Sequence, residues 1–224
     1  MNTILPHITL ETGEHAQHSI IWLHGLGADG QDFAPMAGEL NLPVAIRNIF
    51  PHAPHRPVTI NGGYVMRAWY DIIHPSIDAQ QDEAGIYASQ AALEALIAQE
   101  VARGIAPGNI FLAGFSQGGA IVLHTALRQT VPLGGVVALS TYLPLTELAR
   151  DEASANSRQT PMFIAHGRND TVVPLTLGLA SRDTLLEMGF AVEWHEYGMQ
   201  HSVCEEELRD IESWLTRQLG KAAH

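Results

Sequence analysis

A serine flanked by glycines is the strongest chemical signal in the sequence. The pentapeptide Gly114-Phe115-Ser116-Gln117-Gly118 follows an apolar run at residues 109–113 and precedes an apolar stretch at residues 120–127. In a tight strand-to-helix turn the serine is strained, and a side chain on either flanking glycine would collide with backbone. The helix start would place free N–H groups and the positive end of the helix dipole beside the serine oxygen. We therefore predict a nucleophilic serine at position 116, the alternative being a chance glycine-flanked serine in a turn.

A serine needs a base and an orienting acid, and two later residues are suitably placed for these roles. With this type of turn in an α/β-hydrolase, the chain order is serine, then acid, then histidine. Asp170 follows the apolar run at residues 162–165, and His201 lies between the run at residues 192–196 and the last helical pattern. Both positions fall at the edge of a parallel sheet where active-site loops gather. The sequence thus predicts Ser116 as nucleophile, Asp170 as acid and His201 as base.

Other residues of the right type compete for the same roles. His195 lies within an apolar-polar run and is expected to be a packed strand residue. Asp183 falls on a helical stretch, and Asp71 precedes Ser116, which is the wrong order for this arrangement. We therefore favour Asp170 and His201.

The negative oxygen of an acyl-transfer intermediate needs two N–H donors. One is expected from the residue after the nucleophile, Gln117, and the other from an early loop. The glycine-rich stretch at residues 24–30 follows the apolar run at residues 19–23, and its glycines would let the backbone turn toward a substrate. The N–H of Leu26 is the candidate for the second donor.

The same glycine-rich stretch also matches the dinucleotide-binding pattern, with glycines at positions 25, 27 and 30. That pattern requires an acidic residue about 20 positions later to hold the ribose. Residues 40–70 contain no acidic side chain, so this alternative is disfavoured. His52 and His55 lack a third metal ligand nearby and are expected to be loop residues rather than a metal site. We expect neither a cofactor nor a metal.

Apolar runs alternate with helical patterns along the chain. The expected strands are residues 8–11, 19–23, 45–50, 69–72, 109–113, 135–139, 162–165 and 192–196. Helices are expected over residues 83–103, 120–127 and 204–219, the last beginning with a capping box formed by Ser202 and Glu205. Residues 51–64 are rich in proline and glycine and predict a structured surface loop. The alternation predicts an α/β fold with a mostly parallel central sheet and helices on both faces.

Composition limits the partners and the setting. The chain has 224 residues, which suits one domain spanning residues 1–224, and its net charge is −12. That charge opposes docking on nucleic acid or anionic lipid. The apolar run at residues 20–23 is too short for a signal peptide or a membrane span, and the single Cys204 suits a reducing compartment. We expect a soluble cytoplasmic protein.

A set of motifs in this order resembles the phospholipase/carboxylesterase family of α/β-hydrolases, which includes acyl-protein thioesterases and small bacterial carboxylesterases. The motifs are His24–Gly30, Pro51–Pro57, Arg67–Asp71, Gly114–Gly119, Leu139-Ser140 with Leu143-Pro144, His166-Gly167 with Asp170, and His201-Ser202. The resemblance implies the α/β-hydrolase fold without a large lid domain, no cofactor, the same triad, and Leu26 and Gln117 as oxyanion donors. It also implies that Trp69, Leu143 and Val172 line the acyl groove.

The expected function is a serine carboxylesterase that hydrolyses esters of short to medium acyl chains through an acyl-enzyme on Ser116. The alternatives within enzymes are an acyl-protein thioesterase and a lysophospholipase, since the same triad serves oxygen esters and thioesters. The alternative of another class is a non-catalytic hydrolase-like binding protein. The expected partner is a small ester or acyl thioester, and the expected state is a monomer or a weak homodimer.

Overall fold

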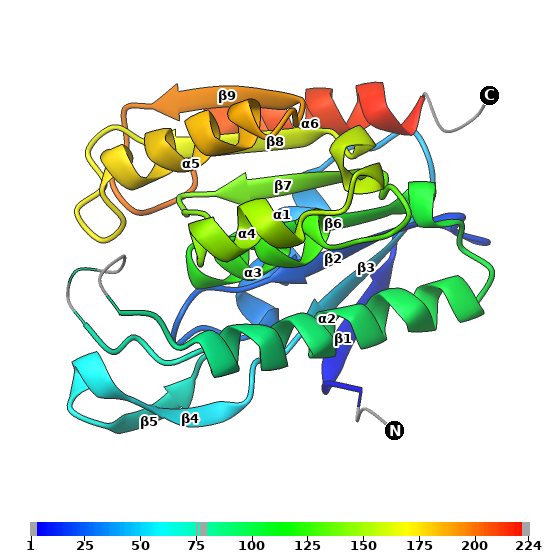
Figure 1. Cartoon of the computed structure of the whole chain (residues 1–224). Helices are drawn as coiled ribbons and strands as arrows, with labels where there is room; N and C mark the ends of the chain where they lie inside the picture. Colours follow the sequence, from blue (N-terminus) through cyan, green and yellow to red (C-terminus); the bar gives the residue numbers. More distant parts are fainter. Residues whose placement is uncertain (1–3, 75, 77–79, 221–224) are drawn as a thin grey trace.

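The central element of the fold is a twisted sheet. The computed structural model describes residues 4–74, 76 and 80–220, and these form a seven-stranded sheet in the order β1-β3-β2-β6-β7-β8-β9. The strands are β1 (His7–Glu11), β2 (His18–Leu23), β3 (Ile46–Pro51), β6 (Ile110–Phe115), β7 (Gly135–Leu139), β8 (Met162–Gly167) and β9 (Val192–Tyr197). Only β1 pairs antiparallel within this described sheet. The arrowheads of β7 and β9 point to the same edge, where the connecting loops gather (Figure 1).

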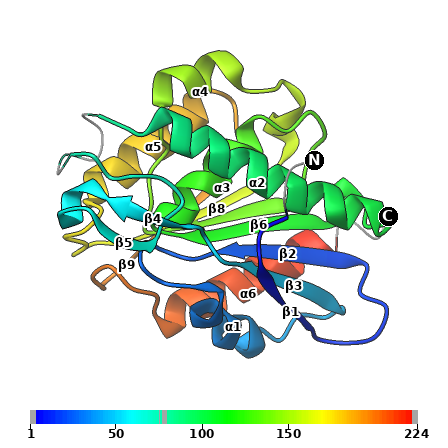
Figure 2. The same ribbon diagram turned by 90° about the horizontal axis from the view of Figure 1, so that it is seen from below.

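Helices cover both faces of the sheet (Figure 2). One face carries α1 (Gly30–Glu39) and α6 (Glu205–Leu219), and the other carries α2 (Glu83–Ala102), α3 (Gln117–Leu127), α4 (Thr146–Glu152) and α5 (Leu175–Glu187). Short 3-10 helices are η1 (Thr59–Asn61), η2 (Pro107–Asn109) and η3 (Asn156–Gln159). Successive β2 residues alternate between the two cores: Ile20 belongs to the core on the α1 and α6 side, and Ile21 to the core on the other side. Apolar side chains on both faces explain why β2 is a continuous apolar run.

The predicted α/β fold is confirmed, and most of the predicted strands match observed ones to within two residues. The prediction of a strand at residues 69–72 is wrong: Ile72 makes only an isolated bridge with Gln81. Apolar residues there are buried by the packing of a loop rather than by pairing in the sheet. Residues 51–64 were expected to be a loop but contribute to a surface hairpin of β4 (His55–Val58) and β5 (Tyr64–Arg67). A two-stranded hairpin tolerates proline because its outer N–H groups have no strand partner.

The helix boundaries match the prediction more closely than the caps do. The helix expected at residues 204–219 is α6, but its N-cap is Cys204, which makes no side-chain cap. The Ser202–Glu205 capping box is therefore wrong, because Ser202 lies two residues before the cap. A capping box does exist at α1, where Asp29 and Asp32 bond to each other's backbone. No helix in the described part of the chain is long and apolar enough to cross a membrane.

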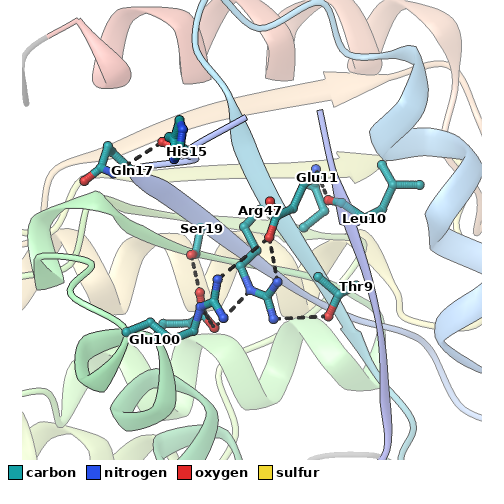
Figure 3. Close-up of polar contacts among 10 residues, drawn as sticks. Thr9, Leu10, Glu11, His15, Gln17, Ser19, Arg47 and Glu100 are labelled. Atoms are coloured by element: carbon teal, nitrogen blue, oxygen red, sulfur yellow. Dashed lines mark hydrogen bonds and ion pairs between the residues drawn. The ribbon is translucent and has the colours of Figure 1, made fainter. Parts of the chain in front are cut away.

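A buried carboxylate holds α2 against the sheet at the edge away from the loops (Figure 3). Glu100 is 1% exposed and accepts hydrogen bonds from Ser19 Oγ at 2.6 Å and from Arg47 Nε at 3.2 Å. Arg47 also bonds Glu11 on β1 at 2.8 Å. The cluster thus ties α2 to β1, β2 and β3.

Removing the arginine should leave the buried Glu100 charge undercompensated. We expect Arg47→Met to lower the free energy of unfolding by about 3 kcal/mol, at the low end of the usual cost because Arg103 Nε remains 3.7 Å from Glu100. Urea denaturation measures this loss. The double variant Arg47→Met with Glu100→Gln should recover part of it; purely additive losses would show that the pair does not interact.

A buried histidine on α3 should make stability depend on pH. His124 is fully buried, and both of its ring nitrogens lack hydrogen-bond partners among the described residues. Burial, reinforced by the Arg128 charge and only partly offset by Glu152, lowers the pKa of His124 to about 3. The imidazole of His124 binds a proton near pH 6.5 in the unfolded chain but only near pH 3 in the folded chain. The folded state is therefore destabilised relative to the unfolded state as pH falls below about 6.5.

Between pH 8 and pH 5, His124 should therefore reduce the free energy of unfolding by about 2 kcal/mol. In His124→Leu, the free energy of unfolding should fall by about 2 kcal/mol less between pH 8 and pH 5 than in the unaltered chain. At pH 8 the two proteins should have similar free energies of unfolding. Urea titrations at the two pH values measure the difference. An identical pH dependence in both proteins would contradict the assignment.

Candidate active site

The backbone at Ser116 is strained, as the glycine pattern predicts. Ser116 has φ 54° and ψ −121° and connects the end of β6 to the start of α3. A Cβ on Gly114 would lie 2.5 Å from the carbonyl oxygen of Gly118, and one on Gly118 would overlap the carbonyl of Leu23. The Ser116 N–H donates to the carbonyl of Leu139 at 2.9 Å. Glycine at both flanking positions is thus a steric requirement of this turn.

A chain of hydrogen bonds joins the three residues predicted as a triad. His201 Nε2 lies 2.9 Å from Ser116 Oγ, and His201 Nδ1 lies 2.7 Å from Asp170 Oδ2. Because a carboxylate only accepts, Nδ1 carries the proton toward Asp170 and Nε2 is left to accept from the serine hydroxyl. The three residues come from loops after β6, β8 and β9, which end at the same edge of the sheet.

The loop after β8 fixes the carboxylate of Asp170. Its Oδ1 accepts from the N–H groups of Val172 at 2.8 Å and Val173 at 2.9 Å. The buried His166 donates from Nε2 to the carbonyl of Val173 at 2.8 Å, and burial lowers the pKa of its imidazole. A neutral His166 therefore holds the loop through its bond to Val173 and adds no positive charge that would pair with the Asp170 carboxylate in place of His201. The sequence pattern at residues 166–170 did not predict this role for His166.

The two N–H groups predicted as oxyanion donors have no hydrogen-bond acceptor among the described residues. Gln117 is the first residue of α3, and Leu26 lies in the loop after β2. That loop lies close to Ser116: a Cβ on Gly25 would be 3.6 Å from Ser116 Cβ. The loop that carries Leu26 thus passes beside Ser116, and neither N–H group is engaged in a hydrogen bond within the described part of the chain.

Trp69 connects the start of α3 to the loop after β2. Its backbone N–H donates to Gln117 Oε1 at 2.8 Å, and its indole N–H donates to the carbonyl of His24 at 2.8 Å. Gln117 Nε2 in turn donates to the carbonyl of Tyr70 at 2.7 Å. His24 bonds Gly25 and Ala53, and burial lowers the pKa of its ring. Trp69 thus links the segments that carry the two predicted oxyanion donors.

A cavity of about 660 Å³ opens beside Ser116 and His201. Its wall includes Leu26 and Val172, together with apolar residues of α1 and of the start of α6. Trp69 and Leu143 are buried, at 1% and 3% exposure, and do not line this cavity. Of the residues expected to line the acyl groove, the structure therefore brings only Val172 to the cavity.

No sequence pattern predicted the cavity residues on α1. Phe33 and Met36 line the cavity from a helix that carries no catalytic motif. Their spacing resembles that of ordinary core residues, so no local signal distinguishes them.

The competing residues have other partners. His195 lies on β9, where its ring stacks on Phe163 with 4.7 Å between the ring centroids. Asp183 lies on α5 and pairs with Arg182. A Cβ on Gly30 would overlap the carbonyl of Phe50, which explains that glycine by close packing. No group of three or more potential metal ligands occurs among the described residues.

The arrangement is chemically suited to nucleophilic acyl substitution. A hydroxyl faces a histidine that can accept its proton, an acid holds that histidine, and N–H groups are available for a developing oxyanion.

Comparison with known proteins points to the same chemistry. The family model described as Phospholipase/Carboxylesterase matches residues 7–219. Acyl-protein thioesterase 1 of Yarrowia lipolytica is 37% identical over 223 residues, covering 96% of this chain and 98% of that protein. Carboxylesterase SOBER1 of Arabidopsis thaliana is 35% identical over 209 residues, covering 91% and 92%.

Solved structures agree with this similarity. The crystal structure of Arabidopsis thaliana SOBER1 superposes with a TM-score of 0.86 at 35% identity, covering 90% of this chain and 99% of that one. The crystal structure of Zea mays acyl-protein thioesterase 2 gives 0.85 at 32% identity, covering 96% and 99%.

The Trp69 link predicts a selective effect on turnover. Trp69→Phe keeps an aromatic ring but removes the donor to the His24 carbonyl, which frees the loop carrying Leu26 to move. We expect kcat for 4-nitrophenyl acetate to fall about tenfold with little change in KM, because the donors act mainly on the transition state.

Trp214→Phe is the matched control, since it truncates another buried tryptophan on α6. Its kcat should stay near that of the unaltered chain. Equal losses in the two variants would show that Trp69 acts through general packing alone.

Proposed function

The chain belongs to the phospholipase/carboxylesterase family and is a serine hydrolase of carboxylic ester bonds, and we propose that Ser116, His201 and Asp170 perform this hydrolysis through an acyl-enzyme. The observation that supports these roles is the continuous hydrogen-bond chain from Asp170 through His201 to Ser116, with links of 2.7 and 2.9 Å. A non-catalytic binding protein would have no need to maintain this alignment.

In the first half of the reaction, Ser116 Oγ attacks the carbonyl carbon of the ester. His201 Nε2 takes the hydroxyl proton, and Asp170 stabilises the imidazolium through Nδ1. The carbonyl oxygen becomes negative and receives hydrogen bonds from the N–H groups of Leu26 and Gln117, each worth ~2.7–4 kcal/mol in the transition state. When the bond to the alcohol breaks, His201 returns the proton to the leaving oxygen.

In the second half, water replaces the alcohol. His201 takes a proton from the water as its oxygen attacks the acyl carbon, and the same N–H groups stabilise the second tetrahedral intermediate. Collapse releases the carboxylic acid and returns the proton to Ser116 Oγ. Each half of the reaction needs first a base and then an acid. His201 Nε2 can serve as both, because Nδ1 keeps its proton toward Asp170 throughout.

For the substrate, we propose esters of short to medium acyl chains. The relatives named carboxylesterase support an oxygen ester as the substrate. The apolar wall of the cavity beside Ser116 supports a substrate with an apolar group. Acyl-protein thioesterase activity is the second candidate, because similar proteins carry that name and a thiolate can replace the alkoxide as leaving group. The lysophospholipase alternative uses the same triad.

We also propose a cytoplasmic setting and a monomer or weak homodimer. The cytoplasmic setting rests on the single Cys204, which suits a reducing compartment.

The triad proposal is tested by replacing the nucleophile. Ser116→Ala should lower hydrolysis of 4-nitrophenyl butyrate at least a thousandfold and abolish labelling by a fluorophosphonate, since the attacking oxygen is gone. Gel fluorescence and peptide mapping measure the label, and absorbance measures turnover.

Ser140→Ala is a matched control. Ser140 is also buried at a strand end and also has a positive φ, 47°, but makes no bond to His201. This variant should keep both label and turnover. A label on any residue other than Ser116, or turnover that survives Ser116→Ala, would rule out the proposed nucleophile.

A further inference from the structure

The cavity beside Ser116 lies on one particular side of the sheet. We define the α1–α6 groove by Phe33 and Met36 on α1, Phe115 at the end of β6, Val203 just before α6 and Leu208 in its first turn. Both helices cover the same face, opposite to α2–α5 (Figure 2). The groove therefore extends from the nucleophile toward α1 and α6, away from the segment that carries Trp69.

The reaction fixes where the leaving oxygen of the substrate must lie relative to His201. The tetrahedral carbon carries Ser116 Oγ, the oxyanion, the leaving oxygen and the acyl group. The leaving oxygen must lie within reach of His201 Nε2, because that nitrogen returns its proton. The groove wall includes His201 itself and the two residues that follow it, Ser202 and Val203. A group attached to the leaving oxygen would therefore continue into this groove.

The inner wall of the groove is apolar and aromatic. The ring centroids of Phe115 and His201 are 4.7 Å apart, and those of Phe33 and Phe115 are 6.3 Å apart. Phe33 is 9% exposed and rests on Trp22 in the core. A wall supported from beneath in this way can bury an apolar alcohol without rearranging.

The groove is also electrostatically one-sided. Its acidic residues are Asp32 and Glu39, and none of the described residues that line it is Lys or Arg. Asp32 Oδ2 is fixed by the N–H of Asp29 at 2.7 Å. With a net charge of −12 on the whole chain, the carboxylates of Asp32 and Glu39 would repel an anionic group in the groove.

We propose that the α1–α6 groove is the subsite for the leaving group and that it takes apolar alcohols or thiols without negative charge. This assignment rests on the proposed function, because it needs the leaving oxygen to face His201. It separates the two halves of the substrate: the groove selects the alcohol or thiol, and the acyl group lies outside it.

Two ester series distinguish the subsite from an acyl pocket. One series varies the alcohol of butyrate esters from ethanol to 2-phenylethanol, and the other varies the acid of ethyl esters from acetate to octanoate. Met36→Trp narrows the groove. We expect it to lower kcat/KM for 2-phenylethyl butyrate at least tenfold relative to ethyl butyrate, and to leave the ratio of ethyl octanoate to ethyl acetate unchanged.

Leu186→Trp, which adds the same ring at an exposed site on α5, should leave both ratios at the values of the unaltered chain. If Met36→Trp changes the acyl ratio instead, the groove holds the acyl chain and the proposal is wrong. Unchanged ratios in both series would also overturn it.

A charge reversal tests the selection against anions. The substrates are the butyrate esters of 4-(hydroxymethyl)benzoate and of its trimethylammonium analogue. At low salt, Glu39→Lys should raise the ratio of kcat/KM for the anionic over the cationic ester about fivefold, and high salt should reduce this gain. Asp151→Lys makes the same change of net charge on α4, on the other face of the sheet, and should leave the ratio unaltered.

An equal shift in both lysine variants would mean that the overall charge, and not the groove, discriminates. Fluorophosphonate labelling at Ser116 and turnover of ethyl butyrate are measured on the same unaltered protein. If the unaltered protein shows neither labelling nor turnover, the proposed function is wrong. If it shows both but the variants do not change the ester ratios as expected, only the subsite assignment is wrong.

Discussion

The strained turn at Ser116 is the constraint on which the rest of the site depends. A serine at φ 54° forces β6 directly into α3, and Gly118 then packs against the carbonyl of Leu23 on the neighbouring strand. The close approach brings the start of α3 beside the loop after β2. One steric requirement thus fixes the position of the Ser116 hydroxyl relative to His201 and to the start of α3.

Hydrogen bonding around this turn keeps polar groups aligned inside a largely apolar protein. His24 and His166 are buried, each with a lowered pKa, and both bond to backbone carbonyls of loops at the carboxyl edge of the sheet. Neutral imidazoles can hold these loops without adding positive charge near Asp170. Such a supporting shell allows a reactive geometry to persist without rearrangement when substrate binds.

The two faces of the sheet contribute differently to the proposed reaction. Helix α3 and the segment with Trp69 support the N–H donors, while α1 and the start of α6 provide the walls of the cavity. The division follows from the position of β6 in the middle of the sheet, since its end is open to both layers. The part of the cavity wall that α1 supplies is therefore separate from the hydrogen bonds of Trp69 that support the predicted N–H donors.

The sequence alone determined the features that arise from local sterics and from periodicity. Glycines two residues before and after Ser116 predicted the turn, apolar runs predicted the parallel strands, and the order of Asp170 and His201 after Ser116 identified residues that the fold brings within hydrogen-bond distance. The tertiary structure alone decided that the indole of Trp69 bonds to the loop after β2, that residues 55–67 include a hairpin, and that the cavity lies against α1. Each of these depends on which distant side chains fill the same space. A buried tryptophan and a cavity-lining phenylalanine have the same local pattern, so only packing distinguishes them.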